Sequence, residues 1–407
     1  MGLFKRKSSS GTDSSKPDKE KVKWSHRPAN TAFKQQRLKA WQPILTPATV
    51  LPTFFLIGVI FVPLGGVKEF TIDYTQCEFR APNTTFEALP SSAYSYHLGS
   101  SVDSAQAVAP TWQFTHDESR PVGQRSLCRL QFSLPIELTR PVFMYYKMTN
   151  YYQNHRRYVK SIVSDQLKGD AISASTLSGG DCKPVDVRDG LPIYPCGLIA
   201  NSFFNDTFLA PVLTNPSGVE GNVTYNMTDK GISWPNEAKK YGVTKYQIGG
   251  AVPPPNWAES YPDGYTESTG FPDLHDDEHF QVWMRTAGLP TFRKLYFRND
   301  QENMAAGIYE LDIYMSASPR PVGLLHFVTL RYYPVAPFSG TKSIVFSTVS
   351  FIGGRNPFLG YAYIVVGGVC IILGLALTLR HLIKPRKLGD PQYLSWNRAG
   401  PNSASTK

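Results

Sequence analysis

Two uncharged apolar runs, one near each end of the chain, predict two membrane-spanning helices. The runs cover residues 40–67 and 356–379. About 20 residues of helix, rising about 1.5 Å each, cross a hydrocarbon core of roughly 30 Å. We therefore expect transmembrane helices over 44–66 and 356–379, joined by the long segment 67–355.

The long segment between the runs alternates apolar and polar residues with a period of two, which is typical of β-strands. Pro and Gly separate the alternating stretches, and long helical patterns do not intervene. We expect a mainly antiparallel, sandwich-like β domain with long loops. The alternating positions are Phe70, Ile72, Tyr74; Leu130, Phe132, Leu134, Ile136, Leu138; Tyr309, Leu311, Ile313, Met315; and Leu325, Phe327, Thr329.

Charge predicts which side of the membrane each segment occupies. Residues 1–43 carry eleven basic and three acidic side chains, and residues 380–407 carry six and one. Lys and Arg beside spanning helices stay in the cytosol, whereas long loops cross largely regardless of charge. We expect both tails in the cytosol and the β domain in the lumen or outside the cell. The pI of about 9.2 therefore indicates contact with membrane phospholipids rather than with nucleic acid.

The N-terminal tail divides into two parts. Residues 1–23 are rich in Ser and Lys and are expected to be disordered. Residues 30–43 place Phe33 and Trp41 among basic residues, which predicts an amphipathic juxtamembrane segment; a connector packed on another protein is the alternative. A cleaved signal peptide is a poor interpretation of the first run, because the run is long and lacks a small-residue cleavage site.

Glycosylation motifs agree with a luminal β domain. Acceptor tripeptides occur at Asn83, Asn205, Asn222 and Asn226, all within 67–355.

Cysteine positions predict two disulfides. Cys77, Cys128, Cys182 and Cys196 lie in the long segment, where three pairings are possible. Cys182 and Cys196 bracket a short turn-rich stretch, which favours their pairing and leaves Cys77 with Cys128. Cys370 lies in the second run and is expected to have no chemistry.

Three glycines in the second run recur every seven residues and form one stripe along the expected helix. Gly360, Gly367 and Gly374 would let another helix approach closely. That helix is either the first span of the same chain or a helix of a partner protein; spacing does not decide between them.

The sequence offers no convincing active site. His275, Glu278 and His279 match the H-x-x-E-H zinc-protease pattern, but they follow Pro272 in an acidic stretch better suited to a loop. The S-x-x-K pattern that ends at Lys342 lacks its companion motifs. We expect no enzyme activity, metal or cofactor; a membrane-anchored luminal hydrolase is the alternative.

Several longer segments closely resemble the cell-division-control protein 50 (ligand-effect modulator) family. They are distributed from about residue 23 to residue 387. The segments are R-P-A-N-T-A-F-K-Q-Q-R-L-K-A-W-Q-P at 27–43, P-C-G-L-I-A-N-S at 195–202, W-M-R-T-A at 283–287, F-R-K-L-Y at 292–296 and N-P-F-L-G at 356–360.

This resemblance implies a noncatalytic β-subunit of a type IV P-type ATPase, a flippase that moves phospholipids to the cytosolic leaflet. It implies an ectodomain that caps the luminal loops of the ATPase, spans that pack beside its helices, and a subunit needed for exit from the endoplasmic reticulum. The resident membrane would be that of the endoplasmic reticulum, Golgi, endosome or cell surface. The resemblance favours the intermolecular role of the Gly stripe, and Asn205 as the most reliable glycosylation site. A stand-alone adhesion protein or receptor would share the topology.

Overall fold

The computed structural model describes residues 30–38, 47–61, 68–98, 108–121, 123–214, 216, 221–258, 260–315, 335–348 and 357–384. The chain divides into two compact units, one of Val59–Gly368 and one of Met1–Gly58 with Val369–Lys407. The expectations for the tail 1–23, for residues 39–43, for most of the C-terminal tail and for the strand at Leu325 lie outside the described residues.

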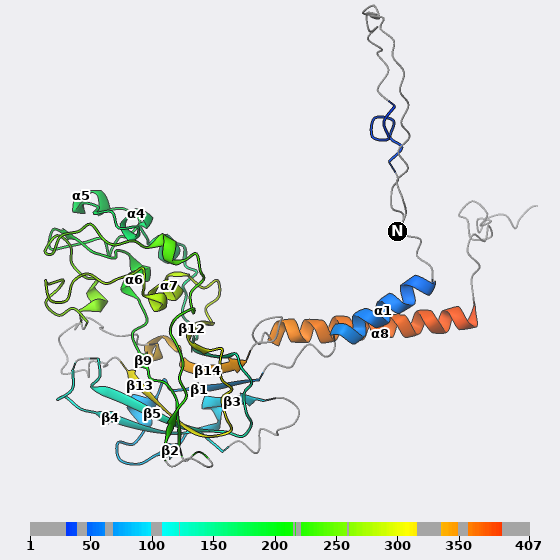
Figure 1. Cartoon of the computed structure of the whole chain (residues 1–407), viewed down its shortest axis with the longest axis horizontal. Helices are drawn as coiled ribbons and strands as arrows, with labels where there is room; N and C mark the ends of the chain where they lie inside the picture. The colour runs from blue at the N-terminus through cyan, green and yellow to red at the C-terminus, as the bar shows by residue number, and fades with distance from the viewer. Residues whose placement is uncertain are drawn as a thin grey trace, which may run out of the picture. The chain divides into compact units, whose positions relative to one another are not determined.

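Two antiparallel sheets form the framework of the larger unit, so the prediction of a mainly antiparallel β domain is confirmed (Figure 1). The first sheet has the order β12 (Phe292–Asn299), β6 (Val142–Met148), β14 (Lys342–Thr348), β1 (Glu69–Asp73) and β3 (Tyr94–His97). The second has the order β11 (Val223–Thr224), β10 (Val212–Thr214), β13 (Gly307–Met315), β5 (Ser126–Leu134), β4 (Thr111–His116) and β2 (Glu87–Ala88), with β9 (Thr207–Phe208) beside β13.

The predicted alternation places one face of each sheet in a shared aromatic core. The ring of Phe132 on β5 lies 5.1 Å from that of Phe70 on β1 and 5.7 Å from that of Phe346 on β14. All three side chains are at most 1% exposed. Burying one such side chain contributes about 1.5–3 kcal/mol, so these cross-sheet contacts hold the two sheets together.

Short helices and a small hairpin fill the long connections between the strands. These elements are α2 (Cys77–Arg80), α3 (Arg156–Lys160), α4 (Ser164–Leu167), α5 (Ala174–Leu177), α6 (Leu198–Asn201), α7 (Glu278–Met284), the hairpin β7 (Val187–Arg188) with β8 (Leu191–Pro192), and 3₁₀ turns at Ser91–Ala93, Ala238–Lys240, Pro255–Trp257 and Ala336–Phe338. Their aromatic side chains extend the core: Phe204, after α6, stacks on Tyr146 of β6 at 4.0 Å, and Trp283 of α7 is fully buried.

The chain enters and leaves the β domain at neighbouring points. β1 and β14 are paired antiparallel with Glu69 opposite Ser347. The Thr348 N–H donates to the Lys68 carbonyl at 3.0 Å. The first strand after the N-terminal helix and the last strand before the C-terminal helix are therefore adjacent in one sheet.

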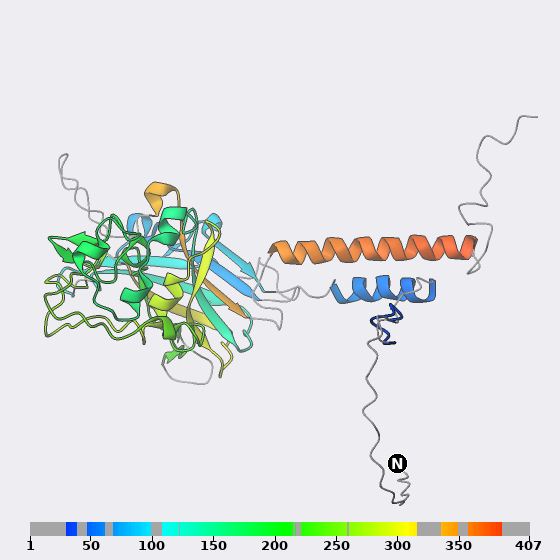
Figure 2. The ribbon, with the colours of Figure 1, turned by 90° about the horizontal axis from the view of Figure 1, so that it is seen from above.

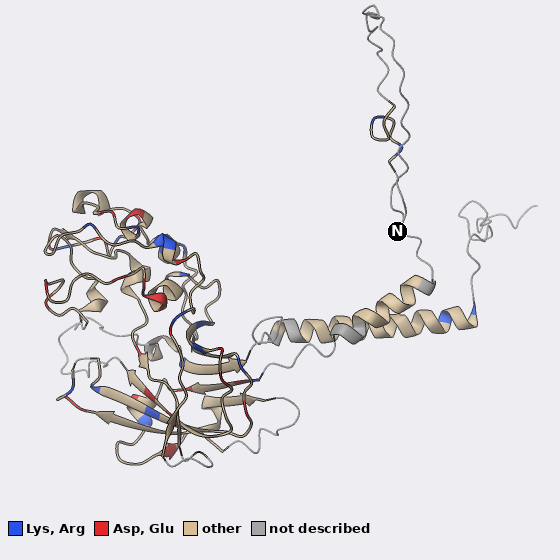
Figure 3. Ribbon diagram, in the orientation of Figure 1, with Lys and Arg blue, Asp and Glu red and all other residues tan. Residues whose placement is uncertain are grey.

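Two apolar helices lie outside the sheets, α1 (Pro47–Phe61) and α8 (Pro357–Ile383). Within the smaller unit, α1 runs alongside the C-terminal part of α8 (Figure 2). α1 carries no charged residue and α8 has a single Arg, at position 380, near its end (Figure 3). Among the described residues, Tyr361–Ile383 is the helical segment long and apolar enough to cross a membrane.

The first predicted span is described only in part. The 15 residues of α1, at about 1.5 Å each, extend about 22 Å. Residues 44–46 and 62–66, which the prediction included, lie outside the described residues. One candidate membrane helix is thus found, and the crossing by the first run stays a prediction.

Candidate functional site

The three side chains of the H-x-x-E-H pattern do not converge on a metal position. His275 lies before α7, and its Nδ1 faces the carbonyl oxygens of Ala238 at 3.0 Å and Tyr241 at 3.1 Å. His279 lies on α7 with its ring 4.2 Å from that of Tyr296, and burial lowers the pKa of His279. No group of His, Cys, Asp or Glu suited to hold a metal occurs among the described residues.

Glu278, the acid of that pattern, has a structural role. Its two carboxylate oxygens accept hydrogen bonds from the backbone N–H groups of Gly231, at 3.0 Å, and Ser233, at 2.8 Å. A carboxylate held by two amides is positioned to fix a loop rather than to activate water. The geometry of these three residues therefore does not favour the hydrolase alternative.

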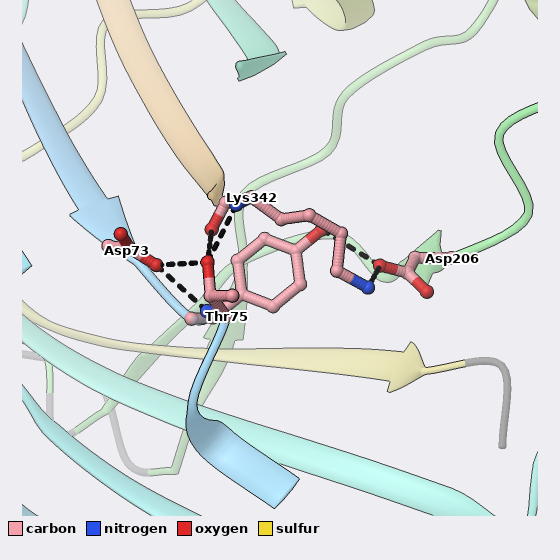
Figure 4. A network of polar contacts seen from close by, with 5 residues as sticks. Asp73, Thr75, Asp206 and Lys342 are labelled. Carbon is pink, nitrogen blue, oxygen red and sulfur yellow. Dashed lines mark hydrogen bonds and ion pairs between the residues drawn. The ribbon is translucent and has the colours of Figure 1, made fainter. Parts of the chain in front are cut away.

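A buried ion pair connects the start of β14 to the segment before β9 (Figure 4). Lys342 Nζ lies 2.5 Å from Asp206 Oδ2, and the two side chains are 9% and 2% exposed. The Tyr74 hydroxyl donates to the same oxygen at 3.0 Å. Burial and the Asp206 charge together raise the pKa of Tyr74, which keeps its hydroxyl protonated as the donor.

A hydroxyl at the end of β1 extends this network. Thr75 Oγ1 accepts the Lys342 N–H at 2.6 Å and lies 2.5 Å from Asp73 Oδ1. This network was not predicted, because the sequence around Lys342 matches the S-x-x-K pattern and contains no acidic partner nearby. A signal was present, since a lysine at the head of the apolar strand K-S-I-V-F needs a buried carboxylate partner.

The P-C-G segment is held by close backbone packing. Gly197 has φ of 101°, and a Cβ there would lie 2.1 Å from the Ser161 carbonyl oxygen. The Leu198 N–H, next in the chain, donates to Ser161 Oγ at 2.8 Å. A glycine is required here both by the left-handed backbone and by the nearby carbonyl.

The disulfides join Cys182 with Cys196, as the spacing favours, and Cys77 with Cys128, the pair that remains. Cys77 is bonded to Cys128, 51 residues away, and Cys182 to Cys196, 14 residues away. The first bond connects α2 to β5, and the second closes the excursion that contains the β7–β8 hairpin. Cys370 on α8 is a free thiol.

The four acceptor asparagines differ in accessibility. Asn83, Asn222 and Asn226 are exposed, whereas Asn205 is half-buried next to the Asp206 ion pair. Occupancy at the four positions stays a prediction.

The Gly stripe contacts the chain's own first helix at one position. A Cβ on Gly374 would lie 3.2 Å from the Phe55 ring of α1. Gly367 is buried too, while most neighbouring positions on α8 are exposed. At Gly374 the structure thus favours the intrachain alternative, and a partner helix would meet the remaining surface, where Ile364, Ile372 and Leu379 are 55–66% exposed.

We expect Gly374→Leu to separate α1 from α8, because the added side chain would overlap the Phe55 ring. Overpacking of this kind costs about 1–3 kcal/mol. Spin labels at Thr53→Cys and Leu375→Cys, with Cys370→Ser, would report the change as a longer and broader distance distribution in pulsed electron paramagnetic resonance. Gly368→Leu is the matched control, because a Cβ at Gly368 meets no atom within 4 Å. Identical distributions in the two variants would contradict this packing.

Comparison with known proteins identifies the family. The model of the LEM3 (ligand-effect modulator 3) family / CDC50 family matches residues 60–387. The Saccharomyces cerevisiae protein named "Phospholipid-transporting ATPase accessory subunit CRF1" is 39% identical over 407 residues, covering 98% of this chain and 95% of that protein. The Chaetomium thermophilum "Phospholipid-transporting ATPase accessory subunit CDC50" is 38% identical, covering 95% of each chain. The Bos taurus "Cell cycle control protein 50A" is 38% identical, covering 86% and 88%. The chain belongs to the LEM3/CDC50 family.

Proposed function

We propose that this chain is the noncatalytic accessory subunit of a type IV P-type ATPase that transports phospholipids. The observation that carries the proposal is the near full-length match to a relative named as an accessory subunit, which includes the β domain and both apolar runs. ATP hydrolysis and lipid movement belong to the ATPase. The dispersed positions of His275, Glu278 and His279 support this division of labour.

The membrane arrangement is part of the proposal. α1 and α8 cross the bilayer, both termini lie in the cytosol, and the β domain lies in the lumen or outside the cell. The basic tails support this orientation, as do the exposed acceptor asparagines at 83, 222 and 226. The disulfides suit an oxidising compartment. The complex resides in the endoplasmic reticulum, the Golgi, endosomes or the plasma membrane.

The subunit acts by holding its partner in several places at once. The β domain contacts the extracytosolic loops of the ATPase, the exposed face of α8 packs on its membrane helices, and the juxtamembrane segment 30–43 contacts it on the cytosolic side. Such a clamp promotes folding of the ATPase and its exit from the endoplasmic reticulum. It also stabilises transport-competent states, provided that it binds those states more tightly than the others.

Affinity purification tests the proposal directly. The tagged full chain, purified in a mild detergent, should recover a P-type ATPase at a one-to-one ratio. His275→Ala should recover as much ATPase as the wild type, because His275 is exposed and its Nδ1 faces carbonyl oxygens of the same chain. Expressed without an ATPase, the chain should stay in the endoplasmic reticulum. Stable surface expression of the chain alone would instead indicate an adhesion protein or receptor.

A further inference from the structure

A cleft of about 740 Å³ lies beside α7 in the β domain. Its walls come from residues 230–238, from the start of α7, and from Leu295 and Arg298 of β12. Glu278 and His275 line it, but both are engaged by backbone groups of the same walls. These contacts give Glu278 and His275 structural roles in the walls of the cleft.

Two polar atoms in this cleft have no hydrogen-bond partner among the described residues. Ser233 Oγ and Arg298 Nε are buried and unpaired, although both residues line the cleft. Buried polar groups in proteins are almost always paired. Both atoms are shut off from solvent, so a ligand with hydroxyl or amide groups would pair with them after the Ser233 and Arg298 side chains turn toward the cleft.

An exposed tryptophan provides a flat apolar surface at the same cleft. Trp234 is 61% exposed, and the Arg285 guanidinium lies 4.1 Å from its ring centroid. An aromatic ring combines a large contact area with few rotatable bonds. A fixed ring beside hydroxyl and guanidinium groups, with acidic Asp276 and basic Lys230 balancing each other in the lining, suits a neutral polyhydroxylated molecule better than an ion or a hydrocarbon chain.

One acceptor asparagine, Asn226, is exposed two residues before the position that pairs with Arg298 of the cleft wall. Burial alternates along the segment, with Tyr225 buried and Asn226 and Thr228 exposed, so Asn226 and Thr228 point the same way. Thr228 is paired with Arg298 by an antiparallel bridge, and directly opposed residues share a face of the sheet. Two residues of extended chain span about 7 Å, so the Asn226 side chain lies within one sugar chain's reach of the Arg298 wall.

We propose that the cleft holds the inner N-acetylglucosamine rings of a glycan carried on Asn226, with one ring stacked on Trp234. The acetamido and hydroxyl groups of the sugars pair with Ser233 and Arg298 once these side chains turn toward the cleft. The inference rests on the luminal placement of the β domain, because only there is the tripeptide modified. The glycan then becomes part of the domain surface instead of extending into solvent.

Site-resolved deglycosylation of the folded full chain tests the inference. A peptide N-glycosidase should release the Asn226 glycan about twofold to tenfold more slowly than the Asn83 glycan, if stacking is as strong as between aromatic pairs. Trp234→Ala should abolish the difference, whereas Trp234→Phe, which keeps a flat ring, should retain much of it. After denaturation the two sites should be released at equal rates in every variant.

A second arm identifies the source of the sugar. The variant Asn226→Gln lacks the chain's own glycan at this cleft. Added di-N-acetylchitobiose should therefore bind the empty cleft and change the tryptophan fluorescence. The double variant Asn226→Gln with Trp234→Ala should show no such change. Equal binding of this disaccharide to the glycosylated wild type would show that the occupant comes from another molecule and would overturn the proposal. An unmodified Asn226, or equal release rates in the folded wild type, would also overturn the proposal.

The pattern of modified sites separates failure of this inference from failure of the luminal placement. Sugars at Asn83 or Asn205 without one at Asn226 would leave the luminal placement intact. A chain modified at none of the four sites would contradict that placement itself.

Discussion

Lys342→Met is expected to lower the free energy of unfolding of the β domain by about 3–5 kcal/mol, the range for removing one partner of a buried ion pair. The substitution removes the Lys342 cation from the Asp206 carboxylate, which is 2% exposed (Figure 4). The Tyr74 hydroxyl still donates to that carboxylate, but it carries no positive charge. Guanidinium unfolding of the full chain in detergent, followed by tryptophan fluorescence, would measure the loss.

A double variant separates the ion pair from simple loss of packing. Asp206→Asn keeps the Asn205 tripeptide intact and still accepts the Tyr74 hydroxyl, so Asp206→Asn with Lys342→Met removes both charges at little change in volume. We expect the double variant to be more stable than Lys342→Met alone, because Asp206→Asn removes the buried negative charge that has lost the Lys342 cation. If the loss of unfolding free energy in the double variant equals the sum of the losses in Asp206→Asn and Lys342→Met, the two side chains do not interact.

Gly197→Ala is expected to be the second severe substitution, with a loss of at least about 3 kcal/mol. A strained backbone region costs about 1–3 kcal/mol, and the new Cβ would additionally overlap the Ser161 carbonyl, whose oxygen lies 2.1 Å from its position. The chain should then fail to accumulate in its folded form, as seen by protease resistance of the full chain in detergent.

Gly190→Ala is the matched control for Gly197→Ala. Gly190 also has a positive φ, of 81°, but a Cβ there meets no atom within 4 Å. It occupies the turn between β7 and β8, so its substitution should cost only the backbone strain. Equal losses at the two glycines would mean that the carbonyl contact contributes nothing.

The sequence predicts the framework well, because alternation reports directly on burial. Leu130, Phe132 and Leu134 are predicted to face inward, and each is at most 1% exposed in β5. The excursion between β6 and β12 could not be predicted in the same way. Its short helices are held by tertiary contacts, such as the stacking of Phe204 on Tyr146, and carry too few residues for a periodic pattern.

The candidate sites were predictable only where chemistry is local. Cys182 and Cys196 bracket a turn, so their bond follows from spacing. Asp206 and Lys342 are 136 residues apart, and no local pattern joins them. The Gly stripe was visible, but the side chain that fills it, Phe55 at Gly374, comes from the other end of the chain.

The hydrogen bond from Thr348 to Lys68 determines how the domain responds to mechanical load. Because β1 and β14 run antiparallel, the start of β1 and the end of β14 lie at the same end of this strand pair. The chain therefore enters and leaves the sheet there. A force that pulls those two chains apart would unzip the pair one rung at a time rather than shear all rungs together. The two tethers therefore share one anchor, and tension on either is borne first by the same pair of residues.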